Sequence, residues 1–203
     1  MAAAEAAVVV DLRALFCPGG IFFPMLDLGA DAGTLRIGIV ELVREAATLL
    51  MLISAGVLAG STFWQRWAFF LIGFGLWDLL YYVWLFVFLG WPPSLMSWDV
   101  LFLIPVAWTG PVIAPCLVAA ALVASGAAIL HLEPRGGMEA FCGLDWALEV
   151  VAGLTIILAF AANTQNCQSL SEEELRFPWI LFGTGLALGL GVFAGALRRG
   201  LRR

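Results

Sequence analysis

The chain has 203 residues, of which 63% are hydrophobic and 12% are charged, and its mean hydropathy is +1.00. A water-soluble surface rich in charge cannot be built from this composition, so the sequence predicts that the lipid bilayer is the solvent of the protein. The formal net charge of −5 argues against nucleic acid as a partner, because a phosphate backbone requires clustered cations.

Five hydrophobic runs, separated by polar residues, proline or glycine, are each long enough to cross a bilayer as a helix. They lie at 37–60, 65–89, 111–130, 140–162 and 178–197. The sequence therefore predicts an all-α integral membrane protein, a polytopic bundle of about five transmembrane helices. Its expected parts are an extramembrane or interfacial segment over 1–36, one membrane domain over 37–197 and a basic cytoplasmic tail over 198–203.

The segment between the second and third predicted helices, WPPSLMSWDVLFLIPVAWTG, is apolar but is interrupted by prolines. Pro92 and Pro93 end the preceding helix, and Pro111 follows Gly110 at a position where proline begins the next one. Because this stretch is apolar but broken, residues 98–109 are predicted to form an interfacial or re-entrant segment.

Arginine supplies all ten basic residues of the chain, which ends in a basic cluster of Arg198, Arg199, Arg202 and Arg203. The loop that contains Ser171 carries three consecutive glutamates and a single arginine, Arg176. By the positive-inside rule, the C-terminus is predicted to be cytoplasmic, and five spans then place the N-terminus outside. The expected location is the bacterial inner (cytoplasmic) membrane.

Ionisable side chains interrupt three of the predicted helices, although each charged group near mid-bilayer costs about 3 kcal/mol on insertion scales. The candidates for intramembrane polar or relay groups are Arg44, Glu45, Asp78, Tyr81, Tyr82, Asp145 and Glu149. The similar depths of Arg44 and Asp78 make an ion pair between them geometrically reasonable. Tyr81 and Tyr82 follow Asp78 by three and four residues, so either hydroxyl is expected to donate a hydrogen bond to its carboxylate.

The predicted spans contain more carboxylates than cations, and Asp145 and Glu149 stand at the i,i+4 spacing at which two negative charges repel. One interpretation is structural: Asp145 lies at the interface, while Asp78 and Glu149, the latter near the midplane, are hydrogen-bonded to neighbouring helices. The alternative is that these carboxylates take up and release protons or cations along a path through the membrane.

Two further pairs of residues are candidates for function, one pair for a ligand-binding face and the other for a disulfide bond. Trp77 and Trp84 are seven residues apart and share one face of the second predicted helix, where stacked indoles suit a planar lipid-like ligand. Cys17 and Cys167 are both predicted outside, where an oxidising compartment permits a disulfide. The sequence identifies no metal site, cofactor or enzymatic active centre, since no motif has the necessary spacing.

Small residues lie at helix-packing spacings on the first and fifth predicted helices, namely Gly56, Gly60, Gly185, Gly189, Gly191 and Gly195. The leading functional hypothesis is a non-enzymatic subunit or scaffold of a larger membrane complex, which packs against other membrane subunits or a second copy. The alternative is a small proton- or cation-coupled transporter that uses Asp78, Asp145 and Glu149. A weaker alternative is binding of a planar lipid-like ligand.

Overall fold

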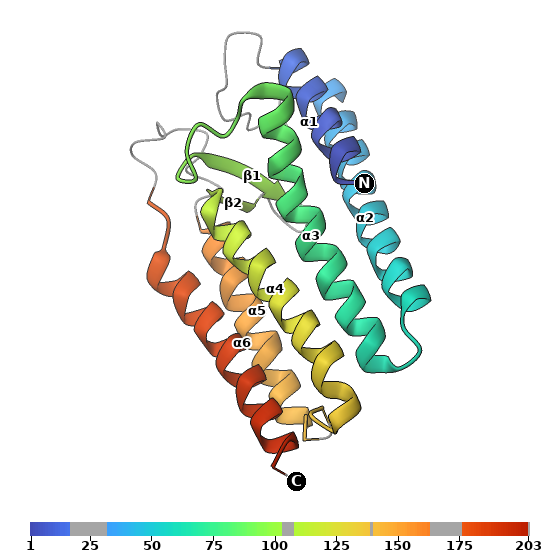
Figure 1. The fold of residues 1–203 in the computed structure, drawn as a ribbon. Coiled ribbons are helices and arrows are strands. Elements are labelled where there is room, and N and C mark those ends of the chain that lie inside the picture. The colour runs from blue at the N-terminus through green and yellow to red at the C-terminus, as the bar shows by residue number, and fades with distance from the viewer. Residues whose placement is uncertain (17–31, 103–107, 139, 163–175, 203) are drawn as a thin grey trace. The chain divides into compact units, whose positions relative to one another are not determined.

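The computed structural model describes residues 1–16, 32–102, 108–138, 140–162 and 176–202. It is 79% helical, and within these residues five helices are long and apolar enough to cross a membrane, which confirms the predicted fold class. A short N-terminal helix, one turn of 3-10 helix and a small two-stranded sheet complete the regular structure of the described residues (Figure 1).

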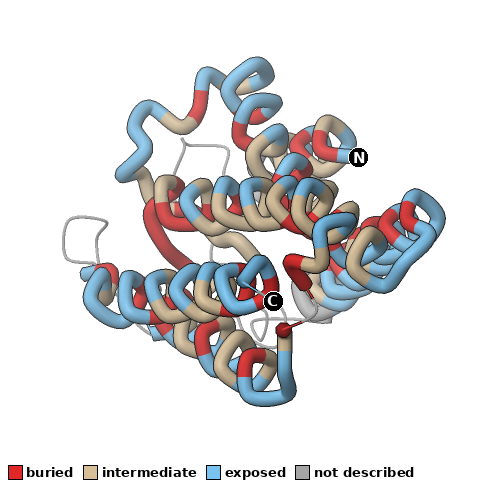
Figure 2. The backbone as a smooth tube through the Cα atoms, turned by 60° about the horizontal axis from the view of Figure 1, so that its bottom comes forward, coloured by how far each residue is buried: buried red, intermediate tan, exposed pale blue. Residues whose placement is uncertain are grey.

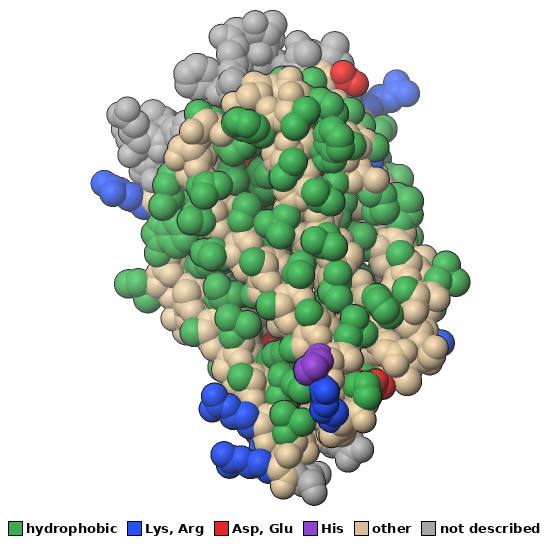
Figure 3. All heavy atoms as spheres, in the orientation of Figure 1, with side chains coloured by type: hydrophobic (Ala, Val, Ile, Leu, Met, Phe, Trp, Pro, Cys, Tyr) green, Lys and Arg blue, Asp and Glu red, His purple; other side chains and the backbone are tan. Residues whose placement is uncertain are grey.

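The five candidate spans are α2 (Ala32–Ala59), α3 (Phe63–Leu89), α4 (Ile113–Leu132), α5 (Gly143–Ala161) and α6 (Trp179–Gly200). Their ends agree with those of the five hydrophobic runs to within about five residues, because hydrophobic length is what a span requires. Hydrophobic side chains are spread over the face drawn in Figure 3, and few charged side chains are seen there. Such a surface suits lipid, since hydrocarbon offers no partner to a charge.

The N-terminal segment contains α1 (Ala2–Phe16), which has 15 residues. A helix of this length is about 22 Å long, which is shorter than the hydrocarbon core of a typical bilayer. After α4, the one-turn 3-10 helix η1 (Glu133–Arg135) ends at Gly136, whose φ of 76° lies in the left-handed region that glycine adopts without strain.

In the segment predicted to be interfacial or re-entrant, the described residues form a strand pair, which was not expected from the sequence. Strand β1 (Trp98–Phe102) pairs in antiparallel fashion with β2 (Trp108–Pro111), and Asp99 lies opposite Gly110. Aromatic and β-branched residues in WDVLF favour a strand over a helix. The consequence for function is that Asp99 is held at a fixed register instead of in an irregular loop.

The chain divides into two compact units, and α2, α3 and α4 each contribute residues to both. The first unit consists of Met1–Leu50, Trp77–Leu117 and Ala161–Phe177. The second unit consists of Met51–Leu76, Val118–Phe160 and Pro178–Arg203.

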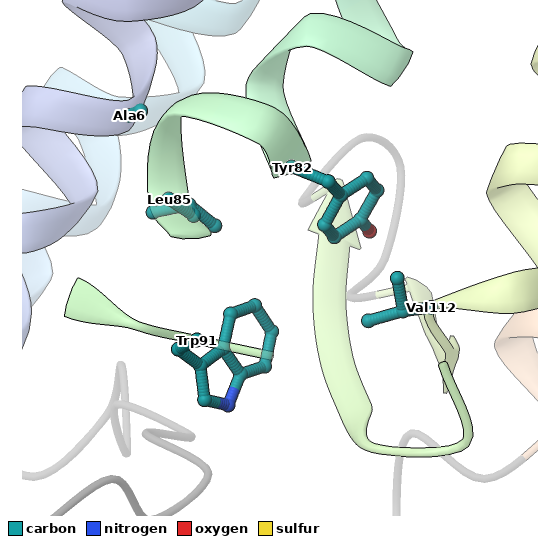
Figure 4. Close-up of a cluster of buried hydrophobic side chains, with 5 residues drawn as sticks. All are labelled: Ala6, Tyr82, Leu85, Trp91 and Val112. Carbon is teal, nitrogen blue, oxygen red and sulfur yellow. The ribbon is translucent and has the colours of Figure 1, made fainter. Parts of the chain in front are cut away.

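The first unit has a core in which α1, α3 and the residues flanking the hairpin meet. Its buried members are Ala6, Tyr82, Leu85, Trp91 and Val112 (Figure 4). Leu85 and Val112 are fully buried, whereas Tyr82 brings a hydroxyl group into this apolar setting. A buried hydroxyl without a hydrogen bond is unfavourable, so the surroundings of Tyr82 bear on function.

The second unit is built on close approaches between helix backbones. A Cβ atom added to Gly75 of α3 would lie 2.5 Å from the carbonyl oxygen of Ala119 in α4. One added to Gly126 of α4 would lie 2.7 Å from the carbonyl oxygen of Ala68. Only glycine permits such distances, and small residues at contacts are how transmembrane helices pack in the absence of a hydrophobic driving force.

An aromatic cluster lies in the second unit where α3 and α5 begin. The indole rings of Trp64 and Trp146 are stacked, with centroids 5.8 Å apart and an interplanar angle of 11°. Phe141 and Trp67 meet the ring of Trp146 edge-on, at 5.1 Å and 5.9 Å. Amphipathic indoles at the ends of membrane helices are typical of the boundary between lipid and water.

Candidate functional site

Three polar side chains converge in the first unit: Asp78 and Tyr82 of α3 and Asp99 of β1. Asp78 is eleven residues from Leu89, the nearer end of α3, which corresponds to about 16 Å along the helix axis. Asp99 is 4% exposed and Tyr82 is 6% exposed. The two carboxylates and the phenol interact electrostatically with one another, so the three groups form one site.

The hydroxyl oxygen of Tyr82 is buried and makes no hydrogen bond within the part of the chain that the structure describes. Its ring extends from α3 on the side where Val112 lies (Figure 4), and Asp99 is its strongest electrostatic neighbour. Of the two hydroxyls that were candidate donors to Asp78, that of Tyr82 therefore makes no such hydrogen bond. Tyr81 contacts the ring of Tyr82 edge-on at 5.1 Å.

The guanidinium of Arg44 is held by two other carboxylates in the first unit. Its Nε donates to Oε2 of Glu41 at 2.8 Å, and it forms a second ion pair with Glu5 of α1. The predicted Arg44–Asp78 pair is therefore wrong: Glu41, one turn earlier, and Glu5 already compensate the cation. Glu45 is buried one turn after Glu41.

Asp145 stabilises both the beginning of α5 and its contact with α6. Its Oδ2 accepts a hydrogen bond of 2.9 Å from the backbone N–H of Cys142, while its Oδ1 lies 2.6 Å from Nη2 of Arg199. The first contact resembles half of a capping box, in which the third helical residue binds the N-cap amide. Because both oxygens are engaged, this geometry favours a structural role for Asp145 over proton relay.

Glu149 lies one turn after Asp145 and six residues from the first residue of α5. Its Oε1 is buried and has no hydrogen-bond partner among the described residues, while its Oε2 faces Gly189 of α6. The helix begins at Gly143, three residues later than predicted, so Glu149 is only about 9 Å along the axis from the helix start. Asp78 is thus farther from the ends of its helix than Glu149 is.

The proposed ligand face of Trp77 and Trp84 is divided between a buried and an exposed indole. Trp77 is buried and its ring lies 6.0 Å from that of Phe102 in β1. Trp84 is 37% exposed, and its ring contacts that of Phe88 at 5.5 Å. This arrangement gives the planar-ligand hypothesis no support.

The cysteines predicted to form a disulfide, Cys17 and Cys167, lie outside the described residues. Cys116 and Cys142 are free thiols. Cys116, at the start of α4, interacts electrostatically with Asp78 and therefore lies beside the site.

Sequence reasoning missed three charged residues that complete these contacts. Asp99 stands alone in an apolar run, which is the same signal that identified Asp78, but it fell outside the predicted spans. Glu5 lay in a segment assigned to the membrane exterior or surface, and Arg199 was interpreted only as a topology signal. Their partners depend on tertiary packing, which helical periodicity does not report.

No protein-family model matches the chain, and neither the curated proteins nor the solved structures give a match. Within the described residues, no group of three or more His, Cys, Asp and Glu side chains is placed to hold a metal ion. The chemistry of the site is that of two carboxylates and one phenol hydroxyl in apolar surroundings. These groups offer oxygen atoms to a cation or a proton.

Proposed function

We propose that the protein is a non-enzymatic integral membrane subunit or scaffold of a larger membrane complex, and that it binds another transmembrane helix on the outer face of α6. The observation that supports this proposal most is that α6 carries small residues on two opposite faces. One face is occupied within the chain, and the other is exposed.

The inner face of α6 packs on α5 within the second unit. A Cβ atom added to Gly185 would lie 2.8 Å from the side chain of Ile156 and 3.0 Å from the carbonyl oxygen of Ala152. Ala196 continues this face and is fully buried. The inner face therefore fulfils the packing role expected from the glycine pattern, and does so inside the chain.

The outer face carries four exposed small residues at spacings of four, four and three, namely Gly183, Ala187, Gly191 and Ala194. A Cβ atom added to Gly183 or Gly191 meets nothing within 4 Å. Figure 2 shows that exposed positions recur along this helix, which ends at the C-terminal label. Lipid tails pack as well on leucine, whereas small residues at such spacings let a second helix approach closely.

The same proposal places the protein in a bacterial inner membrane with its C-terminus in the cytoplasm. Arg66 at the start of α3, Arg135 after α4 and Arg198 at the end of α6 lie at helix ends, as the positive-inside rule requires of cytoplasmic boundaries. Reporter fusions at Arg203 and near Ser171 are expected to report opposite sides. The same side for both would contradict this orientation.

Purification from the native membrane in mild detergent tests the subunit role. The unmutated chain is expected to elute in an assembly larger than one chain, with either a second copy or a different membrane protein. Gly191→Leu and Ala187→Leu should release the partner, because a branched side chain separates the two helices. Gly153→Leu is the matched control, since a Cβ atom there also meets nothing within 4 Å but lies on α5.

Two results would contradict the proposal. One is a chain that is monomeric when extracted from its native membrane. The other is an assembly that survives both Gly191→Leu and Ala187→Leu.

A second candidate function, a small proton- or cation-coupled transporter, is supported by Asp78. In the part of the chain that the structure describes, no arginine forms an ion pair with this carboxylate, although it lies in the middle of α3. Intramembrane carboxylates in such a position often belong to ion pathways. Ion flux into reconstituted vesicles, abolished by Asp78→Asn, supports transport; no flux with the unmutated chain leaves the subunit role alone.

A further inference from the structure

We propose that the end of the second unit at which α3 begins and α4 and α6 end binds the head groups of anionic phospholipids. The inference depends neither on the docking face of α6 nor on the transport hypothesis, because it concerns the lipid that surrounds the protein. Its failure would therefore leave the subunit role unaffected.

Four helix ends meet at this end of the second unit. Thr62, just before α3, donates a hydrogen bond of 2.9 Å from its hydroxyl to Oε1 of Glu133, which follows α4. Gly200, the last residue of α6, lies against the backbone of Gly137. The ion pair that Asp145 makes with α6 adds the start of α5. The charged residues of these elements are therefore gathered at one end of the unit.

Positive charge is in excess at this end. The described residues there include two carboxylates, Glu133 and Asp145, and five arginines, Arg66, Arg135, Arg198, Arg199 and Arg202. Glu139 and Arg203 lie outside the described residues and carry opposite charges, so they do not alter this excess. Basic side chains are seen at the lower end of the face drawn in Figure 3, where Figure 1 shows α4 and α6 ending.

Both described carboxylates at this end already have partners. Asp145 is paired with Arg199, and the two oxygens of Glu133 accept hydrogen bonds from the side chains of Thr62 and Gln65, the second at 3.4 Å. The other four arginines are exposed and form no ion pair with any residue that the structure describes. Their guanidinium groups are therefore available to an anion from outside the chain.

Arg66 and the aromatic residues that follow it match the two parts of a phospholipid. Nε of Arg66 donates a hydrogen bond of 3.1 Å to the carbonyl oxygen of Gly60, so the guanidinium points back towards the start of α3 and away from the hydrocarbon. Trp67 and Phe70 continue towards the middle of α3 with ring centroids 5.4 Å apart, and Trp67 is 36% exposed. A phosphate at Arg66 thus has apolar ring surface beside it for an acyl chain.

These groups select an anionic lipid. The planar guanidinium group matches the oxygens of a phosphate in a bidentate geometry. A zwitterionic head group brings its own cation, which an excess of arginine repels, whereas an anionic head group does not. A free phosphate ion would use the charges but not the exposed aromatic rings, so the combination favours a lipid.

The test titrates the full chain, in an uncharged detergent, with phosphatidylglycerol or with phosphatidylcholine of the same acyl chains. The thermal unfolding midpoint is the readout. Phosphatidylglycerol at roughly ten times its dissociation constant is expected to raise the midpoint by about 3–6 °C in a saturable manner. Phosphatidylcholine should raise it far less. Sodium chloride at about 0.5 M should weaken the response to phosphatidylglycerol, because salt screens the charges of exposed arginines.

Arg135→Gln and Arg198→Gln should each weaken the apparent affinity for phosphatidylglycerol about fivefold. Arg36→Gln is the matched control, since it removes an exposed arginine of α2 in the first unit and should leave this affinity unchanged. Equal responses to the two lipids would overturn the proposal, as would an unchanged affinity in both Arg135→Gln and Arg198→Gln. An equal rise with inorganic phosphate would also overturn it, because the surface would then bind a free anion and not a lipid.

Discussion

The two units of the chain differ in their charged residues and in how their helices pack. The sequence of the first unit contains eleven Asp and Glu residues against four Arg, whereas the second contains four against six. Among the described residues, five buried polar side chains lie in the first unit, and one, Asp145, lies in the second. The second unit instead brings helix backbones together at Gly75, Gly126 and Gly185.

Close backbone contacts and buried carboxylates have different consequences for stability and ligand binding. Close backbone contacts fix a helix arrangement without polar groups, and they leave little space for a ligand. Buried carboxylates do the reverse, because each needs a counter-charge or a ligand and so makes stability depend on what is bound. The stability of the first unit accordingly depends on charge compensation, and that of the second on close contacts between helices.

We expect the largest effect from a substitution that disrupts the close backbone contacts of the second unit. Gly75→Ala should cost about 2 kcal/mol of unfolding free energy, because its Cβ would lie 2.5 Å from the carbonyl oxygen of Ala119. Gly73→Ala, two residues away, meets only Leu52 at 3.8 Å and should gain up to about 1 kcal/mol from helix propensity. The two thermal midpoints measure this difference of about 3 kcal/mol. Equal midpoints would contradict the close approach.

The next effect tests charge compensation in the first unit. Arg44→Gln leaves Glu5 and Glu41 without their shared cation, so we expect a loss of about 2 kcal/mol, reduced from the cost of a fully buried pair because Arg44 is partly exposed. Thermal unfolding in detergent measures it. The control is Arg36→Gln on the same helix, whose exposed side chain should change stability by no more than about 0.5 kcal/mol. Similar losses for both variants would count against the ion-pair network.

The sequence predicted the helices far better than it predicted their contacts. Hydrophobic length alone places α3 and α6, because the bilayer requires about 20 apolar residues per span. The strand pair β1 and β2 was not predicted. A short apolar run beside prolines has the same sequence pattern in an interfacial segment as in a pair of β-strands. Its register depends on which residues of the two strands pair, for example Asp99 with Gly110.

The candidate site was predicted only in part. Asp78 and Tyr82 stood out because polar groups in a span are costly, but their relation to Asp99 depends on how the hairpin meets α3. The Arg44–Asp78 pairing failed for a related reason: similar depth along two helices does not fix which faces meet. The depth of a residue in the membrane can be counted from the sequence, whereas its ion-pair partner depends on how the helices pack.

The smallest expected effect concerns Asp145, the buried carboxylate of the second unit. Asp145→Ala removes both the hydrogen bond from the Cys142 amide and the ion pair with Arg199, so we expect a loss of about 1 kcal/mol, in the usual range for a helix cap plus a half-exposed pair. Asp145→Asn retains an oxygen for the amide of Cys142 and loses only the ion pair, so it should cost about 0.5 kcal/mol or less.

Salt separates these two contributions to the role of Asp145. The ion pair is screened by salt because Arg199 is half-exposed, whereas the hydrogen bond to the Cys142 amide is not. The difference between the unmutated chain and Asp145→Asn should therefore shrink from 0.05 to about 0.5 M choline chloride, while that between Asp145→Asn and Asp145→Ala should persist. Should Asp145→Asn be as damaging as Asp145→Ala at every salt concentration, Asp145 would act through its charge, and the second unit would resemble the first more than its packing implies.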